Sequence, residues 1–232
     1  MLDPELDEPL LQLGFIRSLQ VRDGHAHVAL QLPTSWCAVN FAYMMAKDVR
    51  RALLTVEGIG EVSVRLGDHC AAAEIEAAVN AGKPFAQAFP GEGGHGLAAL
   101  RQIFLRKGFL SRQERLLREL REAGCSAVVI CSLRLGEVTA EEDAFVIRRE
   151  GAAPLRGGSA DALRRYLERR SELGLDPAAT APLIVDPSGE PLLPERIETY
   201  YRDARTARVA LEANGAFCRA VLAANLRNHG EG

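Results

Sequence analysis

The sequence predicts an α+β protein: a small two-layer domain with the element order α-β-β-α-β, followed by a second domain of mixed α/β structure. Three segments within the first 70 residues alternate apolar and polar residues as half-buried strands do, and the segments beside them repeat apolar residues at helical spacing. The run PGEGGHG at residues 90–96 then interrupts both patterns. We therefore predict domains at residues 1–90 and 97–232, separated by a glycine-rich linker at 91–96.

The first domain is expected to open with a short helix and a β-hairpin. The tripeptide Asp3-Pro4-Glu5 offers a capping side chain, a proline suited to the first turn and an acidic residue beside the positive end of the helix dipole. Gly14 is expected to end this helix. Strands at residues 15–22 and 25–32 follow, and Asp23-Gly24 between them is a strong signal for a two-residue hairpin turn.

The remaining elements of the first domain follow from periodicity. A helix from about Cys37 to Leu54 is predicted after Pro33 ends the second strand, because its apolar residues recur every three or four positions. Residues 61–66 alternate as a third strand. Residues 71–81 form a further helix that is expected to stop at Gly82.

In the predicted second domain, apolar and polar residues alternate less regularly. Residues 111–123 begin with a capping box and residues 161–173 form an Arg-rich amphipathic helix. Residues 127–131 are β-branched and predict a short strand. Asn214-Gly215 predicts the turn of a second hairpin between residues 209–213 and 217–222.

Composition excludes several classes of protein. The 28 basic and 31 acidic residues give a formal charge of −3, which argues against a dedicated nucleic-acid or membrane-surface binder. No apolar run approaches the roughly 20 residues that cross a bilayer, and the acidic start does not resemble a signal peptide. Five cysteines, an odd number without repeated spacing, suit a reducing compartment. We expect a cytoplasmic protein without nucleic-acid or membrane partners.

Cys37 is the first candidate functional residue. It stands where a helix is expected to begin, and the unsatisfied N–H groups there stabilise a thiolate, which is the nucleophilic and metal-binding form. Thr34 or Ser35 is expected to cap this helix and to donate a hydrogen bond to the sulfur. The alternative is that Cys37 is a small buried hydrophobe at a strand–helix corner.

The tripeptide Asp68-His69-Cys70 is the second candidate. Carboxylate, imidazole and thiolate all bind iron or zinc, and the topology brings this turn and Cys37 to one edge of the sheet. Two thiolates with His69 would form an open metal site. The alternative is structural, with Asp68 capping the following helix, His69 exposed and Cys70 half-buried.

Four short motifs occur in an order that resembles a known family. They are DPEL at residues 3–6, LGFI at 13–16, LPTSWCA at 32–38 and VEGIGEVSV at 56–64. Together they resemble the SufT/PaaD-like domain of iron–sulfur cluster assembly proteins over about residues 2–67. The chain departs from that pattern at Ala38, where the family has proline, at Trp36, and at Gly67-Asp68-His69-Cys70, where the family has an Asp-Pro-Pro-Trp-like segment.

The resemblance implies a protein that helps to install iron or iron–sulfur centres in client metalloenzymes, with Cys37 as the reactive or ligating residue. The family's threonine corresponds to Thr34, and Asp3 and Glu5 belong to the first motif and are expected to support the site.

We therefore expect a carrier rather than an enzyme, which binds iron or a cluster transiently through Cys37, with Cys70, His69 and Asp68 as further candidate ligands. The sparse ligand set suits delivery, because a closed four-ligand site would retain its metal. A homodimer or the client would complete it. The expected partners are other assembly factors and a client such as a multicomponent oxygenase. Two alternatives stay open: a metal-free interaction module, and a thiol enzyme with Cys37 as nucleophile.

Overall fold

The computed structural model describes residues 1–91 and 96–229, with side chains up to residue 227. The chain forms two compact units, Met1–Arg101 with Leu211–Gly232, and Gln102–Ala210. The predicted second domain includes residues 211–232, whereas these residues group with the first unit. Residues 92–95 of the predicted linker lie outside the described residues.

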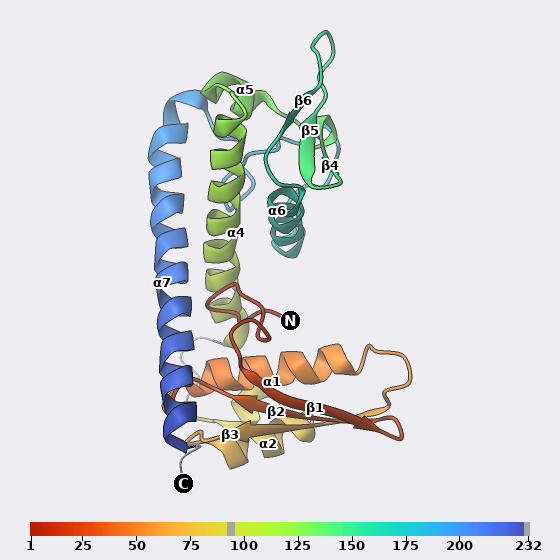
Figure 1. Cartoon of the computed structure of the whole chain (residues 1–232), viewed down its shortest axis with the longest axis vertical. Helices are drawn as coiled ribbons and strands as arrows, with labels where there is room; N and C mark the ends of the chain where they lie inside the picture. Colours follow the sequence, from red (N-terminus) through yellow and green to blue (C-terminus); the bar gives the residue numbers. More distant parts are fainter. Residues whose placement is uncertain (92–95, 230–232) are drawn as a thin grey trace. The chain divides into compact units, whose positions relative to one another are not determined.

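Unit 1 is built around a mixed three-stranded sheet in the order β1-β2-β3 (Figure 1). β1 and β2 are antiparallel neighbours, whereas β2 and β3 run parallel and are joined by the crossover helix α1. Its elements are β1 (Ile16–Arg22), β2 (His25–Gln31), α1 (Val39–Leu53), β3 (Glu61–Gly67), α2 (Ala72–Asn80) and α3 (Phe85–Ala88). The predicted strands and the two helices after Pro33 are thus confirmed to within a few residues.

The turn between β1 and β2 has the conformation that its sequence predicts. Asp23 and Gly24 have φ angles of 49° and 78°, so both central residues lie in the left-handed region that a type I′ turn requires. Arg22 consequently pairs directly with His25 across the turn, and this pairing fixes the register of the hairpin.

The outer edge of β3 is covered by side chains of α2. Asn80 accepts a hydrogen bond from the Val64 amide at 2.8 Å and donates one to the Val64 carbonyl at 2.9 Å, as a neighbouring strand would. Glu76 accepts from the amide of Leu66 at 2.8 Å. These three backbone groups at the sheet edge are therefore paired without a fourth strand.

The predicted N-terminal helix is wrong, because residues 1–14 form consecutive turns. Asp3 does cap backbone amides, accepting from Glu5 and Leu6 at 2.8 Å each. The chain leaves the helical conformation at Asp7, whose φ is 57°, and Pro9 has no N–H to continue a helical ladder. The leucines that suggested a helix face are nevertheless buried: Leu6, Leu10 and Leu13.

The core of unit 1 lies between the sheet and α1, and it also includes the C-terminal part of the chain. Alternate residues of β2 and β3 face the buried side of α1. Leu222 is 3% exposed in the same core and comes from α7 (Ile197–His229), whose C-terminal half belongs to this unit. Gly14 contributes to this contact, since a Cβ there would lie 3.6 Å from the Leu222 side chain.

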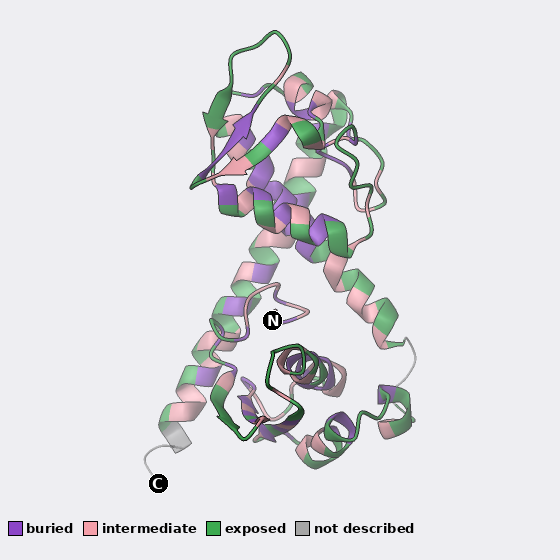
Figure 2. Ribbon diagram, turned by 90° about the vertical axis from the view of Figure 1, so that its right-hand side faces the viewer, coloured by how far each residue is buried: buried purple, intermediate pink, exposed green. Residues whose placement is uncertain are grey.

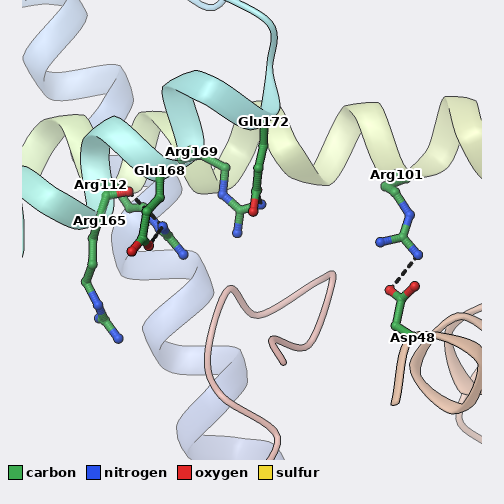
Figure 3. Close-up of polar contacts among 7 residues, drawn as sticks. All are labelled: Asp48, Arg101, Arg112, Arg165, Glu168, Arg169 and Glu172. Carbon is green, nitrogen blue, oxygen red and sulfur yellow. Dashed lines mark hydrogen bonds and ion pairs between the residues drawn. The ribbon is translucent and has the colours of Figure 1, made fainter. Parts of the chain in front are cut away.

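A buried charge in unit 1 is paired. Asp48 on α1 is 5% exposed, and Arg101 donates to its carboxylate at 2.7 Å (Figure 3). Arg51, one helical turn away, lies 3.4 Å from the other carboxylate oxygen. The two guanidinium groups offset the cost of removing this carboxylate from water.

Unit 2 combines helices with a small antiparallel sheet in the order β4-β5-β6. Its buried residues gather on the inner faces of the helices and on β5 (Figure 2). The elements are α4 (Leu97–Glu122) from Gln102 onward, α5 (Ala127–Ser132), η1 (Leu135–Glu137), β4 (Val138–Glu141), β5 (Ala144–Ile147), β6 (Leu155–Gly157), α6 (Ala160–Glu172), η2 (Pro194–Arg196) and the first part of α7. Of the predicted elements, the helix at residues 161–173 is confirmed.

Three other predictions for this half of the chain are wrong. Residues 127–131 are helical rather than extended, because Ser126 caps α5 by accepting from the Val129 amide. Residues 111–122 are helical as predicted, but the helix begins earlier, at Leu97, so Ser111 is buried within α4 and does not start it. Residues 209–222 form no hairpin, since Asn214 and Gly215 lie inside the continuous helix α7.

The interior of unit 2 holds a network of polar side chains. Gln113 is fully buried and donates to the hydroxyl of Tyr166 at 3.1 Å and to the carbonyl of Val185 at 2.8 Å. Arg112 is also buried and donates to the carbonyl of Arg165, near Glu168 (Figure 3). These contacts satisfy groups that would otherwise be costly to bury.

Among the described residues of the whole chain, no helix has the length and apolar composition needed to span a bilayer.

Candidate functional site

Cys37 lies in the loop between β2 and α1, just before the helix. The N-cap residue of α1 is Ala38, and no side chain caps the helix there. The prediction that Thr34 or Ser35 caps α1 is therefore wrong. Thr34 instead contacts the cysteine, with 3.5 Å between its hydroxyl oxygen and the Cys37 sulfur, and its carbonyl accepts from the Cys37 amide at 3.4 Å. The thiol is half-buried and packs against the core of unit 1.

His69 holds the Cys37 loop in place through its imidazole ring. Its Nε2 lies 2.7 Å from the carbonyl oxygen of Cys37, and its Nδ1 accepts from the amide of Ala71 at 3.1 Å. Because a carbonyl can only accept and an amide can only donate, Nε2 carries the hydrogen and Nδ1 the lone pair. Both ring nitrogens are therefore occupied, and a metal ion would have to displace one of these bonds to bind His69.

The three candidate residues after β3 point in different directions. Asp68 is exposed and accepts from the side chain of Gln31 at 3.2 Å, whereas His69 is 7% exposed and Cys70 is exposed. The amide of Cys70 donates to the carbonyl of Ser35 at 3.0 Å, which ties this turn to the Cys37 loop. Asp68 does not cap the next helix, because Ala71 is the N-cap of α2.

Beside these residues lies an open cavity of about 640 Å³. Its walls come from three segments: residues 31–36, residues 68–70 with Ala72, and Asn225 with Leu226 of α7. Cys70 and the strongly exposed Trp36 face this cavity, whereas Cys37 is not among its lining residues. The structure thus places Cys70 at a cavity that Cys37 adjoins only through its loop.

Helix α7 supplies residues that the sequence analysis did not assign to the site. Asn225 donates to the carbonyl of Pro33 at 2.8 Å, four residues before Cys37. Cys218 and Leu226 pack against the same core as Cys37. Their spacing of three or four residues along the chain, together with Leu222, is the helical signal by which they could have been found.

Asp3 is buried in the N-terminal turns of unit 1. Burial raises the pKa of its carboxyl to about 6, although the amides of Leu6 and Glu5 partly offset the rise. Glu5 is half-buried in the same turn. Burial raises the pKa of the Cys218 thiol, and the charges of Cys37, Asp3 and Glu5 add to the rise.

The donor set limits what the site can hold by itself. Among the residues that the structure describes, no three or more histidine, cysteine, aspartate or glutamate side chains are grouped to hold a metal ion. All five cysteines are free thiols. A metal or cluster at Cys37 would therefore need ligands beyond the side chains that the described residues group around it.

Comparison with known families identifies the first part of the chain. Residues 1–65 match the iron–sulfur cluster assembly protein family. The resemblance predicted from the four motifs is therefore confirmed for this segment. The segment contains Asp3, Glu5, Thr34 and Cys37, and it ends before the turn at residues 68–70. The match supports a general role in iron–sulfur cluster assembly. No curated protein and no solved structure gives a significant match to the chain.

Proposed function

We propose that this protein carries iron or an iron–sulfur cluster as cargo and transfers it to a client metalloenzyme, with Cys37 as the sulfur ligand. The observation that carries the proposal is the place of Cys37: a half-buried thiol within the segment that matches the assembly family, on a loop beside an open cavity. Thiolate is the ligand that iron–sulfur clusters use.

The arrangement of donors supports delivery rather than storage. Cys37 has Thr34 beside its sulfur, and the imidazole of His69 is occupied by backbone groups. Cargo at Cys37 would keep coordination positions for a partner, and exchange of those ligands is how transfer to a client would proceed. We propose a metalloenzyme such as a multicomponent oxygenase as client, other assembly factors as further partners, and the reducing cytoplasm as location, which five free thiols suit.

The experiment is anaerobic loading with ferrous iron and sulfide, followed by removal of unbound ions and measurement of iron per chain. Wild-type protein is expected to retain substoichiometric iron, and Cys37→Ser to retain only background. Cys131→Ser is the matched control, because Cys131 is also a half-buried thiol but packs in the core of unit 2. Iron retention by Cys37→Ser equal to that of the control would remove Cys37 from the mechanism.

A second candidate function, a metal-free assembly module, is favoured by one observation. Trp36 is 80% exposed beside the cavity, and exposed tryptophan is typical of energetic centres in protein interfaces. This function predicts that Trp36→Ala weakens binding to the client whereas Cys37→Ser leaves it unchanged, with no iron retained by either protein. Pull-down of the client with loaded and unloaded protein separates the two functions.

A further inference from the structure

The open cavity beside the Cys37 loop lies at the carboxyl ends of two parallel strands. Gln31 at the end of β2 pairs with Gly67 at the end of β3, so the loops that follow both strands leave the same edge of the sheet. These loops form two walls of the cavity, and Asn225 and Leu226 of α7 form the third. Figure 1 shows this end of α7 beside the ends of β2 and β3. The carboxyl ends of parallel strands are a common place for ligands to bind.

Hydrogen bonds between the walls hold the cavity in shape. The amide of Cys70 donates to the carbonyl of Ser35 at 3.0 Å, and the side chain of Asn225 donates to the carbonyl of Pro33 at 2.8 Å. Each of these bonds joins two different walls. The cavity is therefore formed in the free protein, and a partner would bind there without first having to order the loops.

The charge of the cavity is negative. Among the described residues that line it, Asp68 is the only carboxylate, and there is no lysine or arginine. Asp68 is exposed, and it accepts from the neutral side-chain amide of Gln31 at 3.2 Å. His69 adds no positive charge, because its Nδ1 accepts from the amide of Ala71 and so carries no proton. The carboxylate therefore has no cation beside it in the cavity walls.

Trp36 gives the cavity an aromatic wall that is open to solvent. It is 80% exposed, and Leu32 and Leu226 also line the cavity. The face of an indole ring attracts cations, and a guanidinium group both stacks on such a ring and pairs with a carboxylate. A small free cation would cover only part of a ring this exposed, whereas a protein segment would cover the ring and the apolar walls as well. Tryptophan and arginine are also the residues that most often dominate protein interfaces.

We propose that this cavity binds an arginine-containing segment of the client protein, with the guanidinium paired to the Asp68 carboxylate and the Trp36 ring packed against the segment. That the segment belongs to the client rests on the proposed function, whereas the preference of the cavity for an arginine does not. Docking there would bring the client next to the Cys37 loop, since Trp36 directly precedes Cys37 in the chain.

The test uses the intact, metal-free protein and the fluorescence of Trp36, the single tryptophan of the chain. The probe is the tripeptide acetyl-Leu-Arg-Leu-amide, and the matched control peptide carries citrulline, which has the shape of arginine without its charge. We expect the arginine peptide to bind about tenfold more tightly than the citrulline peptide, as one ion pair and one cation–π contact together allow. In Asp68→Asn this preference should fall to about threefold or less.

The Asp68→Asn variant is expected to keep the loop intact. Asparagine still offers an oxygen to the side chain of Gln31, and it tolerates the positive φ of 46° at this position. Asp23→Asn is the matched control, because it removes one carboxylate from the hairpin turn, which is not part of the cavity.

Alkylation of Cys70 by iodoacetamide gives a second readout, which also serves Trp36→Leu, where the fluorescent ring is absent. Cys70 is exposed and lines the cavity, so the arginine peptide should slow its alkylation. Cys131 is the internal reference, because it packs in the core of unit 2. Mass spectrometry of the two cysteine peptides measures both rates, and Trp36→Leu should lose most of the protection at Cys70.

Equal affinity for the two peptides in the wild type, or an unchanged preference in Asp68→Asn, would overturn the proposal. Acetyl-arginine-amide bound as tightly as the tripeptide would replace the protein partner by a small free cation. A change of Trp36 emission on dilution of the protein alone, lost in Asp68→Asn, would replace the client by a second copy of this chain.

Iron loading separates this inference from the proposed function. A preference for the arginine peptide in a protein that retains no iron sinks the function alone. Iron retention that depends on Cys37, without any preference for the arginine peptide, sinks this inference alone.

Discussion

Replacing Asp3 by asparagine should stabilise the protein at neutral pH and much less in acid. Asp3 is 5% exposed, and burial raises its pKa from 3.8 to about 6. As pH rises, the unfolded chain therefore releases this proton before the folded chain does. The stability contributed by Asp3 is complete below its unfolded pKa of 3.8 and is lost as the pH rises to about 6.

The magnitude follows from the shift. About two pKa units correspond to about 3 kcal/mol of ionisation cost in the folded state. Asparagine keeps the oxygen that accepts from the amides of Glu5 and Leu6 but carries no charge. We expect Asp3→Asn to raise the free energy of unfolding by about 3 kcal/mol at about pH 7.5, and by about 1 kcal/mol at about pH 4.5.

The assay is urea unfolding at both pH values, followed by the fluorescence of Trp36, the single tryptophan of the chain, which lies in unit 1. Asp23→Asn is the control, because it removes one carboxylate from an exposed hairpin turn where asparagine tolerates the positive φ. An Asp3→Asn effect that is equal at the two pH values, or a loss of stability near pH 7.5, would refute the reasoning.

Two further predictions concern side chains that pair with polar groups of buried residues. Asn80→Ala leaves the amide and carbonyl of Val64 without side-chain partners, and we expect the free energy of unfolding to fall by about 2 kcal/mol. Asn80→Asp keeps the acceptor, so urea unfolding should show a smaller loss, and an equal loss would contradict this account. Arg208→Met removes the guanidinium that donates to the buried carboxylate of Glu114 at 2.6 Å, leaves that charge without this cation, and should cost about 3–5 kcal/mol. Adding Glu114→Gln should restore part of that loss in thermal unfolding, and a double variant no more stable than Arg208→Met would show that the stranded charge is not the cause.

The parts of the fold that could be predicted from the sequence depend on local patterns. Asp23-Gly24 adopts the left-handed pair of conformations that few other dipeptides tolerate, so the hairpin and the flanking strands follow directly. The N-terminal leucines are buried as their spacing suggested, but Asp7 and Pro9 do not allow the helix. Apolar spacing therefore predicted burial there more reliably than it predicted conformation.

Gly215 shows why other elements could not be predicted. The dipeptide Asn214-Gly215 is typical of a hairpin turn, yet it lies within a helix where the absence of a side chain permits close approach to Glu8. Gly215 and Glu8 are more than 200 positions apart in the chain, so no local pattern encodes their contact. The strands β4 to β6 were missed for a different reason: they are three or four residues long, too short to display a period.

In the candidate site, too, some contacts could be predicted from the sequence and others could not. The contact between Thr34 and Cys37 spans three residues and could be anticipated from the motif. The occupation of both His69 nitrogens depends on where the Cys37 carbonyl lies, and the bond from Asn225 to Pro33 joins residues 192 positions apart in the chain. Tertiary packing decides these contacts, and they change the interpretation of His69 from candidate ligand to positioning residue.

The side chains of α2 that occupy the β3 edge also limit how copies of this protein can assemble. With that edge closed to incoming backbone, the sheet can be extended only at β1, whose outer side faces no other described strand. Two copies joined there would form one continuous sheet whose two remaining edges are both β3 edges that carry α2 side chains. Association through the edges of this sheet would therefore stop at a pair.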